Sequence, residues 1–303
     1  MNIRKMLTLI SLLVMTAALA ACGGSGGGGA ANGKIVIGTQ TYSEPKIIAE
    51  MYKALIEDRT DVKVEIVTDL AASPIVIQAM SRNEVQMATL YTGEIFNGHF
   101  EIEETKDRAA VLRQAQEGFD EHFGFKWFDP YGFENTYAFA IRQEMAGEKG
   151  IETVSDLGKY AKDMRIGVDT TWLERGNDGY RAFVEHYGFS FAKAFPMEIS
   201  LVYEAAASGD VDVVLAYTTD PGIKEFNLKV LADDKQFFPP YDASPVIRKD
   251  ALERHPELEE VISLLIGQID AETMTALNYE VDVNKRTPRE VALEFLKSKG
   301  FLQ

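Results

Sequence analysis

Short apolar runs alternate with amphipathic segments along most of the chain, which is the pattern of an α/β protein. Residues 34–38, 165–168 and 211–217 are rich in β-branched or other apolar side chains and predict buried strands. Residues 47–56 repeat apolar side chains at helical spacing and predict an amphipathic helix. Because strands and helices alternate, we expect mostly parallel sheets, whose ligand sites lie at the carboxyl ends of strands.

Local signals mark where several helices begin and end. Ser43 is predicted to cap a helix, and Thr287-Pro-Arg-Glu290 has the pattern of a capping box with proline at the first helical position. Gly209 is expected to end the helix before it. Further strands are predicted at 62–66, 85–91 and 228–232, and further helices at 73–80, 108–122, 153–161, 179–187, 201–208 and 256–266.

The first residues have the features of an export signal. Arg4 and Lys5 precede an apolar run, and Leu19-Ala-Ala-Cys22 follows it with small residues before the one cysteine of the chain. These four residues resemble the lipobox of bacterial lipoproteins, in which the cysteine is lipidated and becomes the mature N-terminus. We therefore expect a signal peptide over residues 1–21 and lipidation of Cys22. Residues 22–33 are glycine-rich and predict a flexible tether that holds the protein at the outer face of the cytoplasmic membrane.

Length and charge narrow the class of protein further. A chain of 303 residues is long enough for about two domains. Lysine and arginine total 31 and aspartate and glutamate total 47, which gives a formal net charge of −16. Such a surface repels phosphate backbones, so we expect no nucleic-acid partner. One cysteine excludes a disulfide scaffold and a cysteine-rich zinc site.

The residues of common catalytic and metal sites do not form recognisable patterns. The four histidines have no metal-ligand spacing, and no Gly-x-Ser-x-Gly sequence marks a nucleophile. The single cysteine lies at the lipidation sequence and is not available as a catalytic thiol. We therefore expect no metal, no cofactor and no enzymatic activity.

Tyrosines next to predicted strand ends or turns are the strongest candidates for a binding site. Tyr91, Tyr137, Tyr217 and Tyr241 each occur in such a segment, beside polar residues. The faces of aromatic rings attract cations, and a quaternary ammonium group offers no strong hydrogen-bond donor that another kind of site could use. Several tyrosine rings around one cavity would therefore suit a quaternary ammonium ligand.

From Lys34 to the C-terminus the chain resembles the substrate-binding lipoproteins of bacterial ABC importers for osmoprotectants, the glycine betaine/carnitine/choline-binding family. The two most specific segments are Lys126-Trp-Phe-Asp-Pro-Tyr-Gly-Phe-Glu-Asn-Thr-Tyr-Ala-Phe139 and Asp233-Asp-Lys-Gln-Phe-Phe-Pro-Pro-Tyr241. Others are Gly38-Thr-Gln40, Tyr91-Thr-Gly93, Asp178-Gly-Tyr180, Leu215-Ala-Tyr-Thr-Thr-Asp220, His255-Pro-Glu-Leu-Glu259 and Leu277-Asn-Tyr-Glu-Val-Asp282.

The resemblance implies a two-lobed periplasmic-binding-protein fold of type II, with the ligand in the cleft between the lobes. The chain would cross between the lobes twice. By this analogy residues 34–139 and 222–303 form lobe one, and residues 140–221 form lobe two. The protein would act as a monomer that delivers its ligand to the transmembrane subunits of an ABC permease.

The resemblance also assigns roles to particular residues. Tyr91, Tyr137, Tyr217 and Tyr241 would form an aromatic cage for the quaternary ammonium group, which closure of the lobes completes. Gln40, Asn135 and Thr136 would lie near the other end of the ligand.

One position departs from the family pattern. Glu94 stands after Tyr91-Thr-Gly93, where the family often has a small hydroxyl residue. A glutamate that faces the cavity would repel the carboxylate of glycine betaine or carnitine and favour choline. The carboxylate could instead turn to solvent or pair with a lysine or arginine.

Two alternatives remain at this stage. A receptor of the same fold for an amino acid or another zwitterion would need an arginine to hold the carboxylate, and Arg82, Arg165 or Arg175 could serve. An enzyme that acts on choline-like substrates at the cell surface would need catalytic groups that the sequence does not show.

Overall fold

The structure is a computed structural model and describes residues 34–176 and 178–302. The predicted signal peptide, the tether and Cys22 lie outside these residues. Within the described residues, no helix has both the length and the apolar character needed to cross a membrane.

A five-stranded sheet forms the centre of the first lobe. Its strand order is β2-β1-β3-β10-β4. β1 (Lys34–Gly38) runs parallel to its neighbours β2 (Lys63–Val67) and β3 (Met87–Tyr91). β10 (Ala243–Arg248) is antiparallel to β3, and β4 (Phe125–Trp127) is antiparallel to β10.

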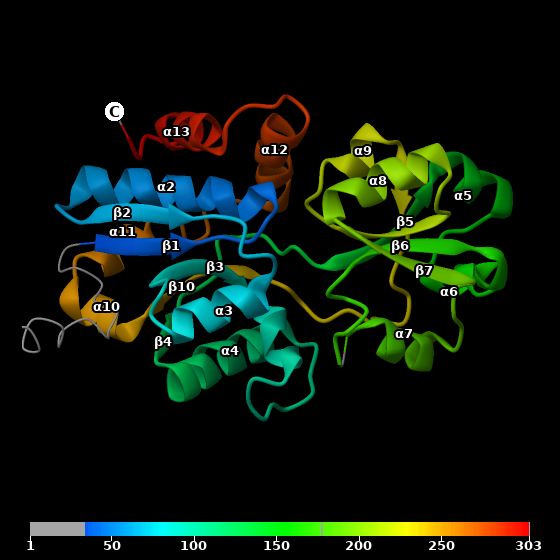
Figure 1. Cartoon of the computed structure of the whole chain (residues 1–303), viewed down its shortest axis with the longest axis horizontal. Helices are drawn as coiled ribbons and strands as arrows, with labels where there is room; N and C mark the ends of the chain where they lie inside the picture. The colour runs from blue at the N-terminus through cyan, green and yellow to red at the C-terminus, as the bar shows by residue number, and fades with distance from the viewer. Residues whose placement is uncertain (1–33, 177, 303) are drawn as a thin grey trace, which may run out of the picture. The chain divides into compact units, whose positions relative to one another are not determined.

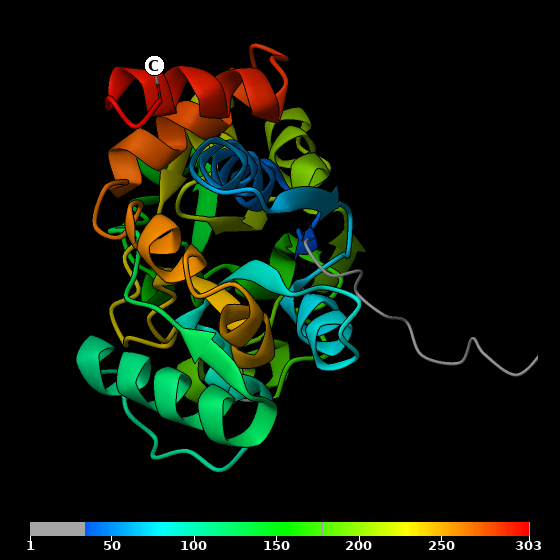
Figure 2. The same ribbon diagram turned by 90° about the vertical axis from the view of Figure 1, so that its left-hand side faces the viewer.

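Helices cover both faces of this sheet, as Figures 1 and 2 show. α2 (Ser43–Arg59) lies on one face, where α11, α12 and α13 pack against it. α3 and α4 lie on the other face. The remaining bounds in this lobe are α3 (Ser73–Ser81), η1 (Thr92–Asn97), α4 (Arg108–Phe123), α10 (Lys249–Arg254), α11 (Leu258–Ser263), α12 (Ala271–Asp282) and α13 (Pro288–Ser298).

The second lobe contains its own five-stranded sheet, in the order β7-β6-β8-β5-β9. β6 (Arg165–Asp169) runs parallel to both β7 (Lys193–Met197) and β8 (Val213–Tyr217). β5 (Tyr137–Arg142) is antiparallel to β8, and the short β9 (Leu228–Val230) is antiparallel to β5.

Alternate residues of these strands enter two different hydrophobic clusters. Leu215 of β8 packs in the cluster that contains Phe183 of α7, whereas Val214 and Ala216 pack in the cluster that contains Val202 of α8. Side chains of a strand point alternately to its two faces, so the sheet is buried on both sides. α8 and α9 lie on one side and α7 on the other (Figure 1). The helix bounds are α5 (Gln143–Lys149), α6 (Val154–Leu157), η2 (Ala161–Asp163), α7 (Tyr180–Tyr187), α8 (Ile199–Ser208) and α9 (Gly222–Glu225).

Two chain segments pass between the sheets and pair with each other. The first connects β4 to β5, and the second connects β9 to β10. They run antiparallel, with a bridge between Glu134 and Asp242. The backbone N–H of Asn135 donates to the carbonyl oxygen of Tyr241 at 3.0 Å, and that of Ala243 donates to Phe133 at 3.1 Å. This pairing fixes the position of residues that lead directly into both sheets.

Several sequence predictions differ from the structure. The expectation of mostly parallel sheets is met in strand direction but not in every pairing. One strand of each sheet, β10 in the first and β5 in the second, runs opposite to the other four, so its pairings with both neighbours are antiparallel. The expected lobe boundaries, residues 34–139 and 222–303 for lobe one, stay a prediction. In the structure all of β5, from residue 137, and β9, at 228–230, belong to the second sheet.

The helix-end predictions have mixed outcomes. The capping box at Thr287 and Glu290 is present, and Gly209 ends α8 with a positive φ of 83°. Ser43 does not cap α2: the N-cap residue is Tyr42, and the Ser43 hydroxyl donates to Asp282 instead. This bond joins α2 to α12.

Candidate functional site

Strand register brings the four predicted tyrosines to one place between the sheets. Tyr91 ends β3 and lies opposite Ala243 of β10, shortly after Tyr241 in the second crossing segment. Tyr137 begins β5 and pairs directly with Tyr217 at the end of β8. The site therefore draws one ring from the first sheet, two from the second and one from a crossing segment.

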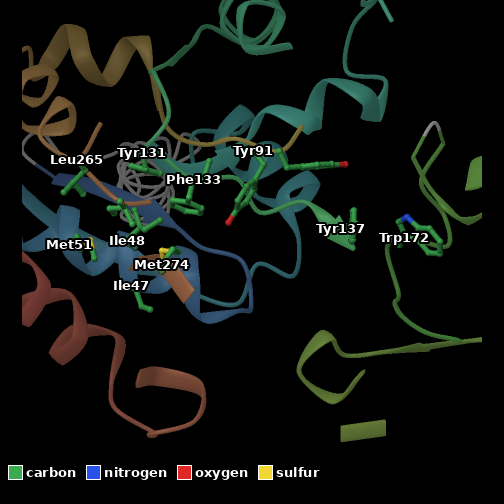
Figure 3. Close-up of a cluster of buried hydrophobic side chains, with 14 of the residues drawn as sticks. Ile47, Ile48, Met51, Tyr91, Tyr131, Phe133, Tyr137, Trp172, Leu265 and Met274 are labelled. Atoms are coloured by element: carbon green, nitrogen blue, oxygen red, sulfur yellow. The ribbon is translucent and has the colours of Figure 1, made fainter. Parts of the chain in front are cut away.

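These four rings line one cavity, whose volume is about 40 Å³. The centroids of the Tyr137 and Tyr217 rings are 5.1 Å apart, and those of Tyr137 and Tyr241 are 5.8 Å apart. We call Tyr91, Tyr137, Tyr217 and Tyr241 the tyrosine cage. Figure 3 shows Tyr91 and Tyr137 on the side of the lobe-one core that faces the second lobe, with Trp172 beyond them.

A fifth ring, Tyr42, also lines the cavity and was missed in the sequence. Its centroid lies 6.5 Å from that of Tyr91 and 5.7 Å from that of Tyr217, so it connects cage residues of the two lobes. Tyr42 follows the carboxyl end of β1 by a few residues. The rule that draws attention to Tyr91 after β3 would also have identified Tyr42.

The cage rings are neutral phenols at physiological pH. Burial raises the pKa of Tyr91, Tyr137, Tyr217 and Tyr241 above the ordinary value for tyrosine. Their hydroxyl groups therefore remain hydrogen-bond donors, and their ring faces keep the negative quadrupole that attracts cations.

Arg175 brings a positive charge to the cavity. Its guanidinium carbon lies 5.7 Å from the ring centroid of Tyr137 and 5.6 Å from that of Tyr241. It forms two hydrogen bonds of 2.9 Å with Asp178, whose carboxylate also accepts a hydrogen bond from the Tyr241 hydroxyl. The guanidinium thus already makes cation–π contacts with two cage rings.

The other two arginines considered in the sequence do not line this cavity. Arg165 bonds to Asp212 and to the carbonyl oxygen of Gly209. Arg82 is exposed at the C-terminal end of α3. Arg175 is therefore the arginine of this group that a carboxylate in the cavity could reach.

Glu94 lines the cavity and is only 2% exposed, so its carboxylate does not turn to solvent. The side-chain amide of Asn97 donates to its Oε2 at 2.6 Å. Burial raises the pKa of Glu94, while the charge of Arg175 opposes that rise. Within the described residues Glu94 forms no direct ion pair with a lysine or arginine.

A second buried carboxylate, Glu44, lies beside the cage. The hydroxyl of Tyr91 donates to Glu44 Oε1 at 2.6 Å, and the hydroxyl of Thr219 donates to Oε2 at 2.7 Å. The side-chain amide of Asn135, which lines the cavity, also donates to Oε1 at 3.1 Å. Glu44 was not predicted as a site residue because its position depends on contacts from both lobes.

Two of the predicted polar residues lie behind the cavity wall. Gln40 is fully buried, and its amide donates to the hydroxyl oxygen of Ser73 and to the carbonyl oxygen of Thr89. Thr136 donates from its hydroxyl to the carbonyl oxygen of Pro239, across the crossing segments. Neither lines the cavity, although Ser73, the partner of Gln40, does.

Gly93 is required by the close approach of Tyr241. A Cβ atom at position 93 would lie 2.3 Å from a ring carbon of Tyr241, well inside van der Waals contact. We expect Gly93→Ala to displace this ring and to weaken ligand binding roughly fivefold, through loss of part of a cation–π contact. Calorimetric titration of the purified variant measures the change.

Gly147 provides the matched control for this prediction. It lies in α5, and a Cβ there would meet nothing within 4 Å. Gly147→Ala should leave ligand affinity unchanged and stabilise the helix slightly. Equal affinities for the two variants would contradict the role assigned to the contact between Gly93 and Tyr241.

No group of three or more histidine, cysteine, aspartate or glutamate side chains in the part of the chain that the structure describes could hold a metal ion. The side chains that line the cavity offer aromatic faces, the carboxylate of Glu94, the guanidinium of Arg175, the amide of Asn135 and the hydroxyls of Ser73 and Thr171.

Comparison with known proteins adds independent information. Residues 33–298 match the OpuAC family model, described as the substrate-binding domain of an ABC-type glycine betaine transport system. The chain is 42% identical to the carnitine transport binding protein OpuCC of Listeria monocytogenes, over 99% of this chain and 98% of that protein. It is 34% identical to a glycine-betaine-binding protein of Pseudomonas aeruginosa, over 88% of each.

A solved structure also matches closely. The crystal structure of a glycine betaine/carnitine/choline ABC transporter protein superposes with a TM-score of 0.73 at 41% identity. The match covers 88% of this chain and 99% of that one. The two lobes described above are therefore those of a type II periplasmic-binding-protein fold, as the sequence resemblance implied. The chain belongs to the OpuAC family of substrate-binding domains of ABC transporters.

Proposed function

We propose that this protein is the extracytoplasmic binding component of an ABC importer for quaternary ammonium compounds and holds its ligand in the tyrosine cage. The observation that supports this most directly is the convergence of Tyr91, Tyr137, Tyr217 and Tyr241 on one cavity. Membership of a family of transport binding domains agrees with binding and delivery of a solute rather than with catalysis.

The electrostatic environment favours a ligand with a permanent positive charge. Glu94 and Glu44 are buried at the cage, and Arg175 is paired with Asp178. The charges of Arg175 and Asp178 cancel each other. Arg175 therefore does not neutralise Glu94 and Glu44. Negative charge in a water-poor site attracts a cation more strongly than it would at the surface. We therefore propose choline as the preferred type of ligand.

Carboxylate-bearing betaines are the second candidate ligand class. Arg175 lies over two cage rings, where it could leave Asp178 and bind a carboxylate in a bidentate manner. The relatives named for carnitine and glycine betaine agree with this second class. Glu94 affects the two ligand classes in opposite ways. Its negative charge would attract choline and would repel the carboxylate of a betaine.

Ligand entry requires movement of the lobes or of Arg175. A cavity of about 40 Å³ has room for only a few water molecules, because each needs roughly 10–15 Å³ of such a cavity. A trimethylammonium group is bulkier than water and takes the place near Tyr137 and Tyr241 that the guanidinium holds. We propose that the lobes open about the two crossing segments and close again over the bound ligand.

We propose that the N-terminal sequence anchors the protein to the membrane. We propose lipidation at Cys22 and attachment to the outer face of the cytoplasmic membrane, from which a monomer docks on the permease subunits. Mass spectrometry of the mature N-terminus tests the lipidation.

A ligand screen tests the proposed function. Choline, glycine betaine, carnitine and free amino acids are added separately to the purified chain, and the midpoint of thermal unfolding is followed. A ligand that binds only the folded state raises this midpoint in a concentration-dependent way. We expect choline to give the largest shift and free amino acids none. A shift with amino acids but not with quaternary ammonium compounds would refute the proposal.

A further inference from the structure

Glu44 is a buried carboxylate in contact with a cage tyrosine. It is 1% exposed and lies in the first turn of α2. Among the described residues, no lysine, arginine or histidine forms an ion pair with it. Burial of a carboxylate without a positive partner is unfavourable unless hydrogen bonds replace its hydration. Its location beside the cage therefore calls for an explanation.

Four donors satisfy the two carboxylate oxygens. Tyr91 and Asn135 donate to Oε1 at 2.6 and 3.1 Å, and Thr219 and Asn278 donate to Oε2 at 2.7 and 3.5 Å. These residues come from β3, a crossing segment, the loop after β8 and α12, so both lobes contribute.

The donors favour the ionised form of Glu44. The amide nitrogen of Asn278 also donates to the carbonyl oxygen of Thr219 at 3.2 Å, which fixes the orientation of that amide. A carboxylate accepts at all of its lone pairs, whereas a protonated carboxyl needs an acceptor for its own proton. Burial raises the pKa of Glu44 on balance, although the hydrogen bonds from Tyr91, Thr219, Asn135 and Asn278 oppose that rise and stabilise the carboxylate.

A hydrogen bond from a phenol to a carboxylate changes the ring as well as the hydroxyl. The O–H bond is polarised toward the negative oxygen, so electron density at the phenol oxygen and ring increases. The attraction between a ring face and a cation is electrostatic and depends on this density. A hydrogen bond to a charged group is also stronger than a neutral one and holds the Tyr91 ring in place.

We propose that Glu44 is a specificity-determining positioning residue that supplies the cage with a fixed negative charge, acting through the hydroxyl of Tyr91. The inference rests on the proposed function, because it concerns how the cage distinguishes a cation from a neutral molecule of the same shape. The ring faces already attract a cation, and Glu44 adds to this preference for the positive charge of the ligand over a neutral molecule of the same shape.

The test compares choline with its uncharged carbon analogue, 3,3-dimethyl-1-butanol, in the wild-type chain and in Glu44→Gln. The two molecules have the same shape, so a purely structural loss weakens both equally. We expect Glu44→Gln to weaken choline binding on the order of tenfold, from loss of a nearby charge at low dielectric. Binding of the neutral analogue should change by about twofold or less. The measured quantity is the ratio of the two dissociation constants from calorimetric titration.

Thr219→Val is the matched control. It removes one hydrogen bond to Glu44 from the opposite lobe and leaves the carboxyl group in place and bonded to Tyr91. The choline-to-analogue ratio should remain close to that of the wild type. A change in this ratio as large as that of Glu44→Gln would overturn the inference.

A second variant decides the question if Glu44→Gln does not fold. Tyr91→Phe keeps the ring and removes the hydroxyl that joins it to Glu44, so it should raise the ratio of the choline to the analogue dissociation constant, as Glu44→Gln does. If the wild-type chain binds choline and the ratio of dissociation constants is unchanged in the folded variants, the inference about Glu44 is overturned but the proposed function is not. Failure of the wild-type chain to bind choline overturns the proposed function as well.

Discussion

Tyr137→Ala is expected to weaken choline binding by about 2 kcal/mol, which is roughly thirtyfold in dissociation constant. Tyr137 packs against two other cage rings, Tyr217 and Tyr241, and against Phe238 outside the cage. Its removal eliminates one cation–π contact and also the support that keeps two other rings in place. Calorimetric titration with choline measures the loss.

Tyr137→Phe separates the ring from the hydroxyl. The phenylalanine ring keeps a negative face and the packing against Tyr217, so choline affinity should fall much less than in Tyr137→Ala. Tyr279→Ala serves as the control, because Tyr279 is an exposed tyrosine of α12 that does not line the cavity. If Tyr137→Ala binds choline as tightly as Tyr279→Ala does, Tyr137 does not hold the ligand.

Glu94→Thr is expected to shift the preference of the site from choline toward glycine betaine by on the order of tenfold to a hundredfold in the ratio of affinities. The carboxylate of Glu94 is buried in the cavity wall and would repel the carboxylate of a betaine. A threonine removes this repulsion and offers a hydroxyl that can donate to the betaine. Choline loses a favourable charge in the same substitution.

Two further substitutions define what the Glu94 experiment measures. Glu94→Asp keeps the charge and should retain a preference for choline. Glu101→Thr removes an exposed glutamate and should leave the ratio unchanged, since charges at the surface are screened by solvent. The assignment of Glu94 to ligand selection is rejected if its threonine variant has the wild-type ratio of choline to glycine betaine affinity.

The four tyrosines named from the sequence line one cavity, but not every strand that carries them could be predicted. Tyr91 and Tyr217 were identifiable because each follows an apolar strand that can be recognised from its own residues. β10 was missed since Pro245 lies in its middle, and proline is unusual in a central strand. In the structure, the carbonyl oxygen of Pro245 accepts a hydrogen bond from the backbone of Phe128 at 3.1 Å.

The residues behind and between the rings could not be predicted from local sequence. Glu44 has the sequence position of an ordinary acidic residue in a first helical turn, where it would complement the helix dipole. Its contact with Thr219 joins residues 175 positions apart, and that of Arg175 with Tyr241 joins residues 66 positions apart. Such contacts depend on how the two lobes face each other, which no local pattern contains.

If the lobes rotate as we propose, the paired crossing segments determine how far each ring travels. Points near a rotation axis move through short arcs, and Tyr137 and Tyr241 lie within a few residues of the bridge between Glu134 and Asp242. If that bridge is the pivot, these two rings keep nearly the same spacing in every lobe orientation. They then form an initial binding site for an arriving solute even when the lobes are open. Tyr42 and Tyr217 come from opposite lobes and would move further apart. The dissociation rate of the solute would then depend on how often these two rings separate.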